Sequence, residues 1–171
     1  MKRVLLLLLL AVAHCGFAMD LVTPSGKLQG ALSSRATDIA VFKGIPYAIA
    51  PIGARRWTYA EAHRGWQGVR NAGRFSPACA QHPYPEGSFF ARSSEPTSED
   101  CLYLNVWSSL PEGEALPVMV WIHGGALTRG SGSAATYDGT ELAKKGVVLV
   151  TINYRLGVFG YMAHPELSSE V

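Results

Sequence analysis

The segment of the chain with the clearest chemical potential is a glycine- and serine-rich stretch at residues 124–133 (GGALTRGSGS). Glycine has no side chain, so its backbone can pass close to a bound molecule and adopt φ values that other residues avoid. Backbone N–H groups held in such a loop can stabilise an oxygen that gains negative charge during a reaction. The same residues are also compatible with an ordinary flexible loop between a strand and a helix.

Residues 1–18 have the pattern of an export signal. Lys2 and Arg3 precede an apolar run at residues 4–13. Gly16 and Ala18 place small residues at the two positions that a signal peptidase recognises. The apolar run is short for a membrane span, so we expect no stable membrane anchor. We predict cleavage near Ala18 and a secreted or periplasmic protein that begins at residue 19. A buried N-terminal helix and a lipid anchor at Cys15 are the alternatives.

Cleavage would leave the mature chain with an even pair of cysteines, Cys79 and Cys101. An even number of cysteines in an exported protein favours a disulfide, and two unpaired thiols are the alternative. We expect no metal site at either cysteine. The segment between them is interrupted by prolines and glycine, which predicts a compact loop closed by the disulfide.

The elements around the glycine-rich loop indicate an α/β fold. Residues 28–32, 39–42 and 102–107 are expected to be strands, and residues 44–77 to be irregular. Residues 117–122 and 147–152 are continuously apolar, as in strands buried on both faces. A short helix expected at residues 139–145 makes these two strands parallel neighbours in a βαβ unit. Since one short helix cannot cover both faces, the sheet is expected to be incomplete.

Four ordered blocks of sequence resemble the type-B carboxylesterase and cholinesterase family. They are residues 42–48 (FKGIPYA), 98–107 (SEDCLYLNVW), 120–133 (VWIHGGA followed by GSGS) and 153–160 (NYRLGVFG). The resemblance implies that residues 19–171 are the N-terminal portion of an α/β-hydrolase domain, whose central sheet is mixed and mostly parallel.

The same resemblance implies a serine esterase that hydrolyses small-molecule carboxylic esters without a cofactor. In this family the nucleophile lies in a G-x-S-x-G elbow. No such elbow occurs in the chain, because residues 130–133 place glycine and serine at other offsets. His123 and His164 match no catalytic base of the family, and we interpret His123 as a residue that shapes the loop. The serine, acid and base are therefore expected beyond Val171, and residues 19–171 alone are expected to be inactive and not to fold stably.

Matched residue by residue to the family, Gly124, Gly125 and Ala126 form the oxyanion-hole loop, with the N–H groups of Gly125 and Ala126 as donors. Leu127 stands where the family often has an aromatic residue, which alters the wall of the acyl pocket. Cholinesterases bind quaternary ammonium on a tryptophan in the disulfide loop. Residues 79–101 contain no tryptophan. Phe89 and Phe90 would be weak substitutes, so short-chain or aryl esters are favoured over choline esters.

The resemblance further suggests an ion pair between Arg56 and Glu99 that fixes the disulfide loop against the sheet. Two separately solvated side chains are the alternative. Neither residue is expected to take part in the chemistry.

The charge balance excludes some partners. Lys2 and Arg3 account for the whole formal charge of +2, which leaves the predicted mature chain neutral. Nucleic acid is therefore not an expected partner. A non-catalytic cholinesterase-like adhesion or binding protein is the alternative function, because such proteins share these motifs and differ mainly at the nucleophile.

Overall fold

The computed structural model describes residues 18–85, 87–88, 95–109 and 115–168. Residues 1–17 of the expected signal segment lie outside these ranges, as do Phe89 and Phe90. Among the helices that are described, none combines the length and the apolar character that crossing a membrane requires.

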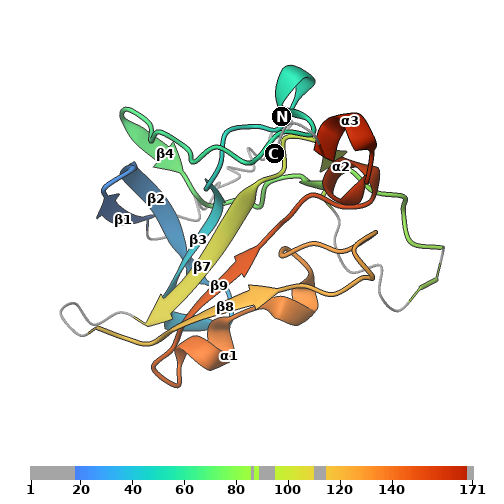
Figure 1. Cartoon of the computed structure of the whole chain (residues 1–171). Coiled ribbons are helices and arrows are strands. Elements are labelled where there is room, and N and C mark those ends of the chain that lie inside the picture. Colours follow the sequence, from blue (N-terminus) through green and yellow to red (C-terminus); the bar gives the residue numbers. More distant parts are fainter. Residues whose placement is uncertain (1–17, 86, 89–94, 110–114, 169–171) are drawn as a thin grey trace, which may run out of the picture.

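One mixed sheet forms the centre of the described structure (Figure 1). Its strands lie in the order β1 (Ala18–Thr23), β2 (Gly26–Ser33), β3 (Ala36–Pro46), β7 (Tyr103–Ser109), β9 (Val148–Ile152) and β8 (Val118–Ile122), and β4 (Val69–Asn71) pairs with β2. β8 and β9 are parallel, as predicted. The successive pairs from β1 to β9 are antiparallel, so the sheet is mixed as expected, but its described part is mostly antiparallel rather than mostly parallel. A separate parallel pair joins β5 (Ala78–Cys79) to β6 (Thr97–Ser98).

The central strands divide their apolar side chains between the two faces of the sheet, because successive residues of a strand point in opposite directions. Ile39, Val41 and Trp107 pack with Ala143 on one face. Leu28, Ala40 and Phe42 pack with Ala72 in a second cluster. The core is thus centred on β3 and β7, beside the strands that lead into the glycine-rich loop.

The predicted helix is present as α1 (Thr140–Ala143), which covers the Trp107 face of the sheet. Its first residue donates a backbone hydrogen bond of 3.0 Å to the Asp138 carboxylate. Gly146 follows the helix with φ +80°, a conformation that glycine adopts without strain. The remaining helical segments are single turns: η1 (Gly53–Arg55), η2 (Ala135–Tyr137), α2 (Val158–Tyr161) and α3 (Pro165–Ser168).

The expectation that residues 44–77 are irregular holds for most of this range and fails at the end of β3 and at β4. β3 continues to Pro46 across a register shift between Phe42 and Ile45, where Gly44 has φ +64°. The Gly44 N–H keeps a hydrogen-bond partner at this irregularity, because it donates to the Asn105 side chain at 3.0 Å. β4 is a second, short exception, and β1 was not predicted at all.

β8 lacks the cover on both faces that its apolar sequence calls for, which agrees with the expectation of an incomplete sheet. All five of its side chains are exposed, from 42% for Trp121 to 63% for Val118 and Ile122. β8 is the last strand of the sheet and has only β9 as a partner among the described residues. An edge strand of this kind leaves backbone groups and apolar side chains uncovered.

Candidate functional site

The backbone after β8 contains an unusual turn at residues 125–127. Gly125 has φ +132°, Ala126 +53° and Leu127 +60°, and the latter two are the only non-glycine residues with positive φ in the described ranges. This left-handed conformation costs an L-residue roughly 1–2 kcal/mol. Strain of this kind persists where the surroundings hold the chain in place, and it clusters at functional sites.

Gly125 is required by the closure of this turn. Its carbonyl accepts hydrogen bonds from the N–H groups of Thr128 (3.1 Å) and Arg129 (3.2 Å) and from the Thr128 hydroxyl (3.1 Å). A Cβ atom at position 125 would lie 2.0 Å from the Arg129 carbonyl oxygen. Any side chain here would therefore force the turn open.

The N–H groups of Gly125 and Ala126 donate to no other described residue, and both residues are exposed. They line a cavity of about 850 Å³, together with Gly124 and residues 128–131. Residues of the disulfide loop, including Gln81, Tyr84 and Thr97, also line this cavity. Free backbone donors on a fixed turn facing a cavity can stabilise negative charge on a bound oxygen.

The segment at residues 153–157 holds the glycine-rich loop at three points. Gly132 N–H donates to Asn153 Oδ1 (2.8 Å), Tyr154 Oη donates to the His123 carbonyl (2.6 Å), and Gly157 N–H donates to the Leu127 carbonyl (2.8 Å). These bonds cross from the end of β9 to the end of β8. They hold the strained residues of the loop in place.

Asn153 is itself fixed by Tyr47, from the first block of the family resemblance. Tyr47 Oη donates to the Asn153 carbonyl at 2.7 Å. Burial raises the pKa of Tyr47 to about 12, although Arg155 opposes the shift. The hydroxyl therefore remains a donor throughout the neutral range.

The two serines of the loop are buried and hydrogen-bonded. Ser131 and Ser133 are 3% and 7% exposed, and their hydroxyls lie 2.6 Å apart. Ser131 also donates to Asn153 Oδ1 (3.3 Å) and Ser133 to Glu95 Oε2 (3.0 Å). These contacts give both hydroxyls a part in holding the loop.

His123 lies beneath the loop and is only 2% exposed. Its Nδ1 is 2.9 Å from the Gly124 carbonyl, which can only accept, so Nδ1 carries the proton. Its Nε2 has no partner among the described residues. Burial lowers the pKa of His123, so the ring is neutral at pH 7. His164 is exposed and lies just before α3, where its Nδ1 accepts from Glu166 N–H at 3.3 Å.

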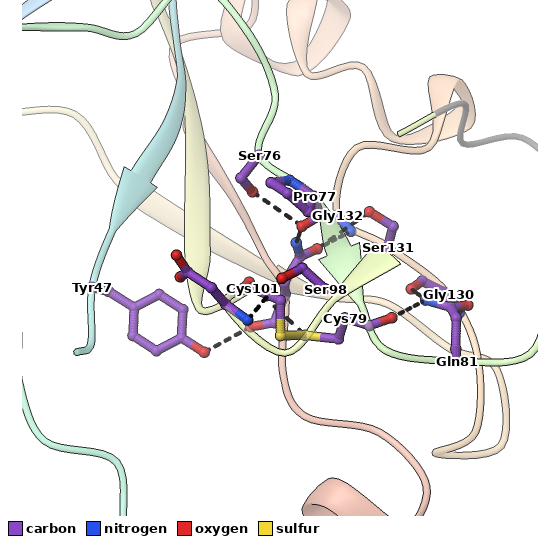
Figure 2. The surroundings of a disulfide bond; sticks show 12 residues. Tyr47, Ser76, Pro77, Cys79, Gln81, Ser98, Cys101, Gly130, Ser131 and Gly132 are labelled. Atoms are coloured by element: carbon purple, nitrogen blue, oxygen red, sulfur yellow. Dashed lines mark hydrogen bonds between the residues drawn. A yellow bond between two sulfur atoms is a disulfide. The ribbon is translucent and has the colours of Figure 1, made fainter. Parts of the chain in front are cut away.

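The predicted Cys79–Cys101 disulfide is confirmed, with a Cα–Cα distance of 4.9 Å. Both cysteines are buried in a cluster with Ala48, Leu102 and Leu156. Figure 2 shows Gln81 extending from the Cys79 end of this loop to Gly130. The disulfide therefore lies next to the glycine-rich loop, although the two are distant in sequence.

The structure also brings Arg56 and Glu99 together. The guanidinium donates two hydrogen bonds to the carboxylate, at 2.5 and 2.8 Å. Hydrogen bonding to Arg56 lowers the pKa of Glu99, and the same contact raises the pKa of Arg56. Arg155 Nη1 donates to the Arg56 carbonyl at 2.9 Å, which connects the pair to the 153–157 segment.

Sequence reasoning located the loop and missed most of the groups that hold it. Gln81 carries no signal beyond its place two residues after Cys79. Asn153 and Tyr154 lie in a block that was singled out, but nothing in the block indicates that it contacts residues 123 and 132. Within the described ranges, no group of three or more histidine, cysteine, aspartate or glutamate side chains could hold a metal ion.

Comparison with known proteins gives a consistent result. The model of the carboxylesterase family matches residues 19–170. The fumonisin B1 esterase of Sphingopyxis macrogoltabida is 48% identical over 150 residues, which are 86% of this chain and 26% of that protein. The para-nitrobenzyl esterase of Bacillus subtilis is 42% identical over 141 residues, 82% of this chain and 28% of that protein.

Among solved structures, a PNB esterase superposes with a TM-score of 0.75 at 40% identity, over 86% of this chain and 30% of that chain. The α/β-hydrolase fold of such carboxylesterases is therefore the fold of this chain, in part. The chain spans between about a quarter and a third of the length of the proteins it matches.

Proposed function

This chain belongs to the carboxylesterase family, and we propose on that premise that it supplies the oxyanion hole of a serine esterase that hydrolyses carboxylic esters. The donors are the N–H groups of Gly125 and Ala126. The observation that carries the proposal is their position: both lie on a strained, anchored turn, donate to no other described residue and line a cavity.

The proposed reaction proceeds through an acyl-enzyme. A serine hydroxyl, deprotonated by a histidine, attacks the ester carbonyl, and the carbonyl oxygen gains the negative charge that the two N–H groups stabilise. The C–O bond to the alcohol then breaks as the histidine returns the proton to the leaving oxygen. Water repeats the sequence on the acyl-enzyme and releases the carboxylic acid. The serine, acid and base belong to parts of the protein outside residues 1–171, which contain no G-x-S-x-G elbow.

The proposed substrates are small esters with short-chain or aryl groups. A cavity of about 850 Å³ is in the range of small-molecule sites, roughly 300–1,000 Å³. Its described walls include Pro83, Tyr84 and Ala126, and residues 79–101 contain no tryptophan to bind a quaternary ammonium. The missing tryptophan carries this choice, because relatives named as choline and as non-choline esterases match the chain about equally well.

We propose further that the protein is exported. The N-terminal segment has the order of a signal peptide, with Lys2 and Arg3 before the apolar run and Ala18 at the cleavage position. A disulfide between Cys79 and Cys101 fits an oxidising compartment. N-terminal sequencing of the mature protein should find its first residue near position 19.

The function is tested by expressing the full-length protein from the complete reading frame and assaying nitrophenyl esters. We expect turnover, and covalent capture of a fluorophosphonate at a serine. Residues 19–171 expressed alone should hydrolyse the same esters no faster than the buffer. A full-length protein that neither turns over esters nor reacts with the fluorophosphonate would instead be a binding protein of the same fold.

A further inference from the structure

Gln81 makes a reciprocal contact with the backbone of Gly130. Its Nε2 donates to the Gly130 carbonyl at 2.8 Å, and the Gly130 N–H donates to its Oε1, also at 2.8 Å. Nε2 donates a further bond of 2.9 Å to the Cys79 carbonyl. Figure 2 shows the side chain lying between the disulfide and Gly130. The amide thus uses both of its donors and its acceptor on backbone groups.

The position of Gly130 is tied directly to that of the oxyanion-hole loop. Gly130 has φ +116°, and a Cβ atom there would lie 2.3 Å from His123 Nδ1 and 2.6 Å from the Gly124 carbonyl oxygen. Its neighbour Arg129 donates the N–H that closes the turn onto Gly125. A shift of Gly130 would therefore move both the backbone beneath Gly124 and the end of the 125–129 turn.

The other anchors leave this part of the loop unsupported. Tyr154, Gly157 and Asn153 hold residues 123, 127 and 132. Among the described residues, Gln81 is the side chain that bonds Gly130 on both its N–H and its carbonyl. The amide therefore pairs with both backbone groups of Gly130, as a neighbouring β-strand pairs with a residue in a sheet.

We propose that Gln81 is a positioning residue for ester hydrolysis: it joins the disulfide loop to Gly130 and thereby sets the direction of the Gly125 and Ala126 N–H groups. This proposal rests on the proposed function. Gln81 acts through the backbone and needs no contact with the reacting atoms. Gln81 should therefore stabilise the transition state, in which the oxygen carries charge. It should hardly affect the binding of the uncharged ester.

The test compares Gln81→Met, Gln81→Glu and wild type in the full-length protein. Methionine keeps the length of the side chain and removes all three hydrogen bonds. We expect kcat to fall about ten- to a hundredfold with KM nearly unchanged, as expected when reacting groups are displaced by about 1 Å. Affinity for a trifluoromethyl ketone, which mimics the tetrahedral intermediate, should fall by a similar factor. Glutamate keeps the acceptor for Gly130 N–H, so Gln81→Glu should lie between wild type and Gln81→Met.

Gln67→Met is the matched control, because Gln67 is exposed and lies outside the loop and the disulfide segment. It should leave kcat, KM and inhibitor affinity unchanged. If Gln81→Met has wild-type kcat and inhibitor affinity, or raises KM alone, the positioning role is wrong although the esterase assignment stands.

Amide hydrogen exchange tests the same inference without any assay of activity. In Gln81→Met, exchange at Gly130, Thr128 and Arg129 should be at least about ten times faster, since the N–H groups of Thr128 and Arg129 close the turn onto Gly125. Unchanged exchange at Thr128 and Arg129 would overturn the inference. A wild-type protein without esterase activity would contradict the proposed function, and the exchange data would still decide whether Gln81 positions the loop.

Discussion

Tyr154 holds His123 at two points: the rings stack with centroids 4.5 Å apart, and the Tyr154 hydroxyl donates a 2.6 Å hydrogen bond to the His123 carbonyl. His123 is the first residue after β8, so this contact fixes the direction in which the chain enters the glycine-rich loop. The two residues lie 31 positions apart in the sequence.

Tyr154→Phe should destabilise the full-length protein. Phenylalanine keeps the ring stack and removes the donor, which leaves the His123 carbonyl without this partner, at a cost of about 1–3 kcal/mol. Urea unfolding measures the change. Tyr59→Phe is the control, because Tyr59 is 73% exposed and its hydroxyl has no hydrogen-bond partner among the described residues. Equal unfolding midpoints for the two variants would show that the hydroxyl is not needed.

Gly125→Ala should reduce kcat by roughly a hundredfold or more, the cost of losing an oxyanion-hole donor. The added Cβ would meet the Arg129 carbonyl oxygen at 2.0 Å, so the turn must open and carry both N–H groups away from the cavity. Gly53→Ala is the matched control: Gly53 also has positive φ, +57°, but nothing lies within 4 Å of a Cβ atom there. Steady-state kinetics on nitrophenyl esters should show the loss for Gly125→Ala alone.

The strands and the helix around the loop were predictable because their signals are local. β2, β3, β7, β8, β9 and α1 follow apolar runs and glycine stops that can be recognised within a short window. β4 has no such signal, since its three residues are mostly exposed. β1 also lacks one, because Leu21 and Val22 are 43% and 74% exposed and the strand is defined by its pairing with β2.

The loop itself was predictable from its glycines and the family motif, whereas its anchors were not. Gln81 reaches Gly130 across 49 positions, and Asn153 reaches Gly132 across 21. Such bonds depend on which loops the sheet brings together, and no spacing along the chain encodes them. The exposure of β8 agrees with the expectation from the sequence that one short helix cannot cover both faces of the sheet.

Removing the disulfide should lower both stability and activity. Replacing Cys79 and Cys101 with serine should cost about 2–5 kcal/mol of unfolding free energy. Since the Cys79 carbonyl accepts a bond from Gln81, kcat should fall as well, even at temperatures where the variant is fully folded. Mass spectrometry of a non-reduced digest of the exported protein checks the bond itself. Finding both thiols free would contradict the disulfide and the prediction that depends on it.

The Arg56–Glu99 pair should make part of the stability dependent on pH. Because Arg56 holds the pKa of Glu99 below its usual value of 4.5, the stabilisation is complete above that value and is lost as the pH falls through the lower pKa of the folded state. Glu99→Gln should therefore be less stable than wild type at pH 7, and the two should converge in acid. Arg56→Gln and the double variant complete the cycle: without the arginine, Glu99→Gln should have little further effect. A constant difference between wild type and Glu99→Gln down to pH 3 would contradict the assignment.

Residues 19–171 expressed alone should self-associate through β8. Val118, Val120 and Ile122 are 63%, 54% and 63% exposed along one face of an edge strand, and flat apolar edges of this kind pair with other chains. Val120→Lys should raise the monomeric fraction, because a charge on an edge strand disfavours pairing between copies. Val158→Lys is the control, since Val158 is 59% exposed in α2, away from the sheet edge. Light scattering gives the mass and circular dichroism the melting behaviour. A wild-type segment that is monomeric and melts cooperatively would show that the exposed face of β8 does not drive association.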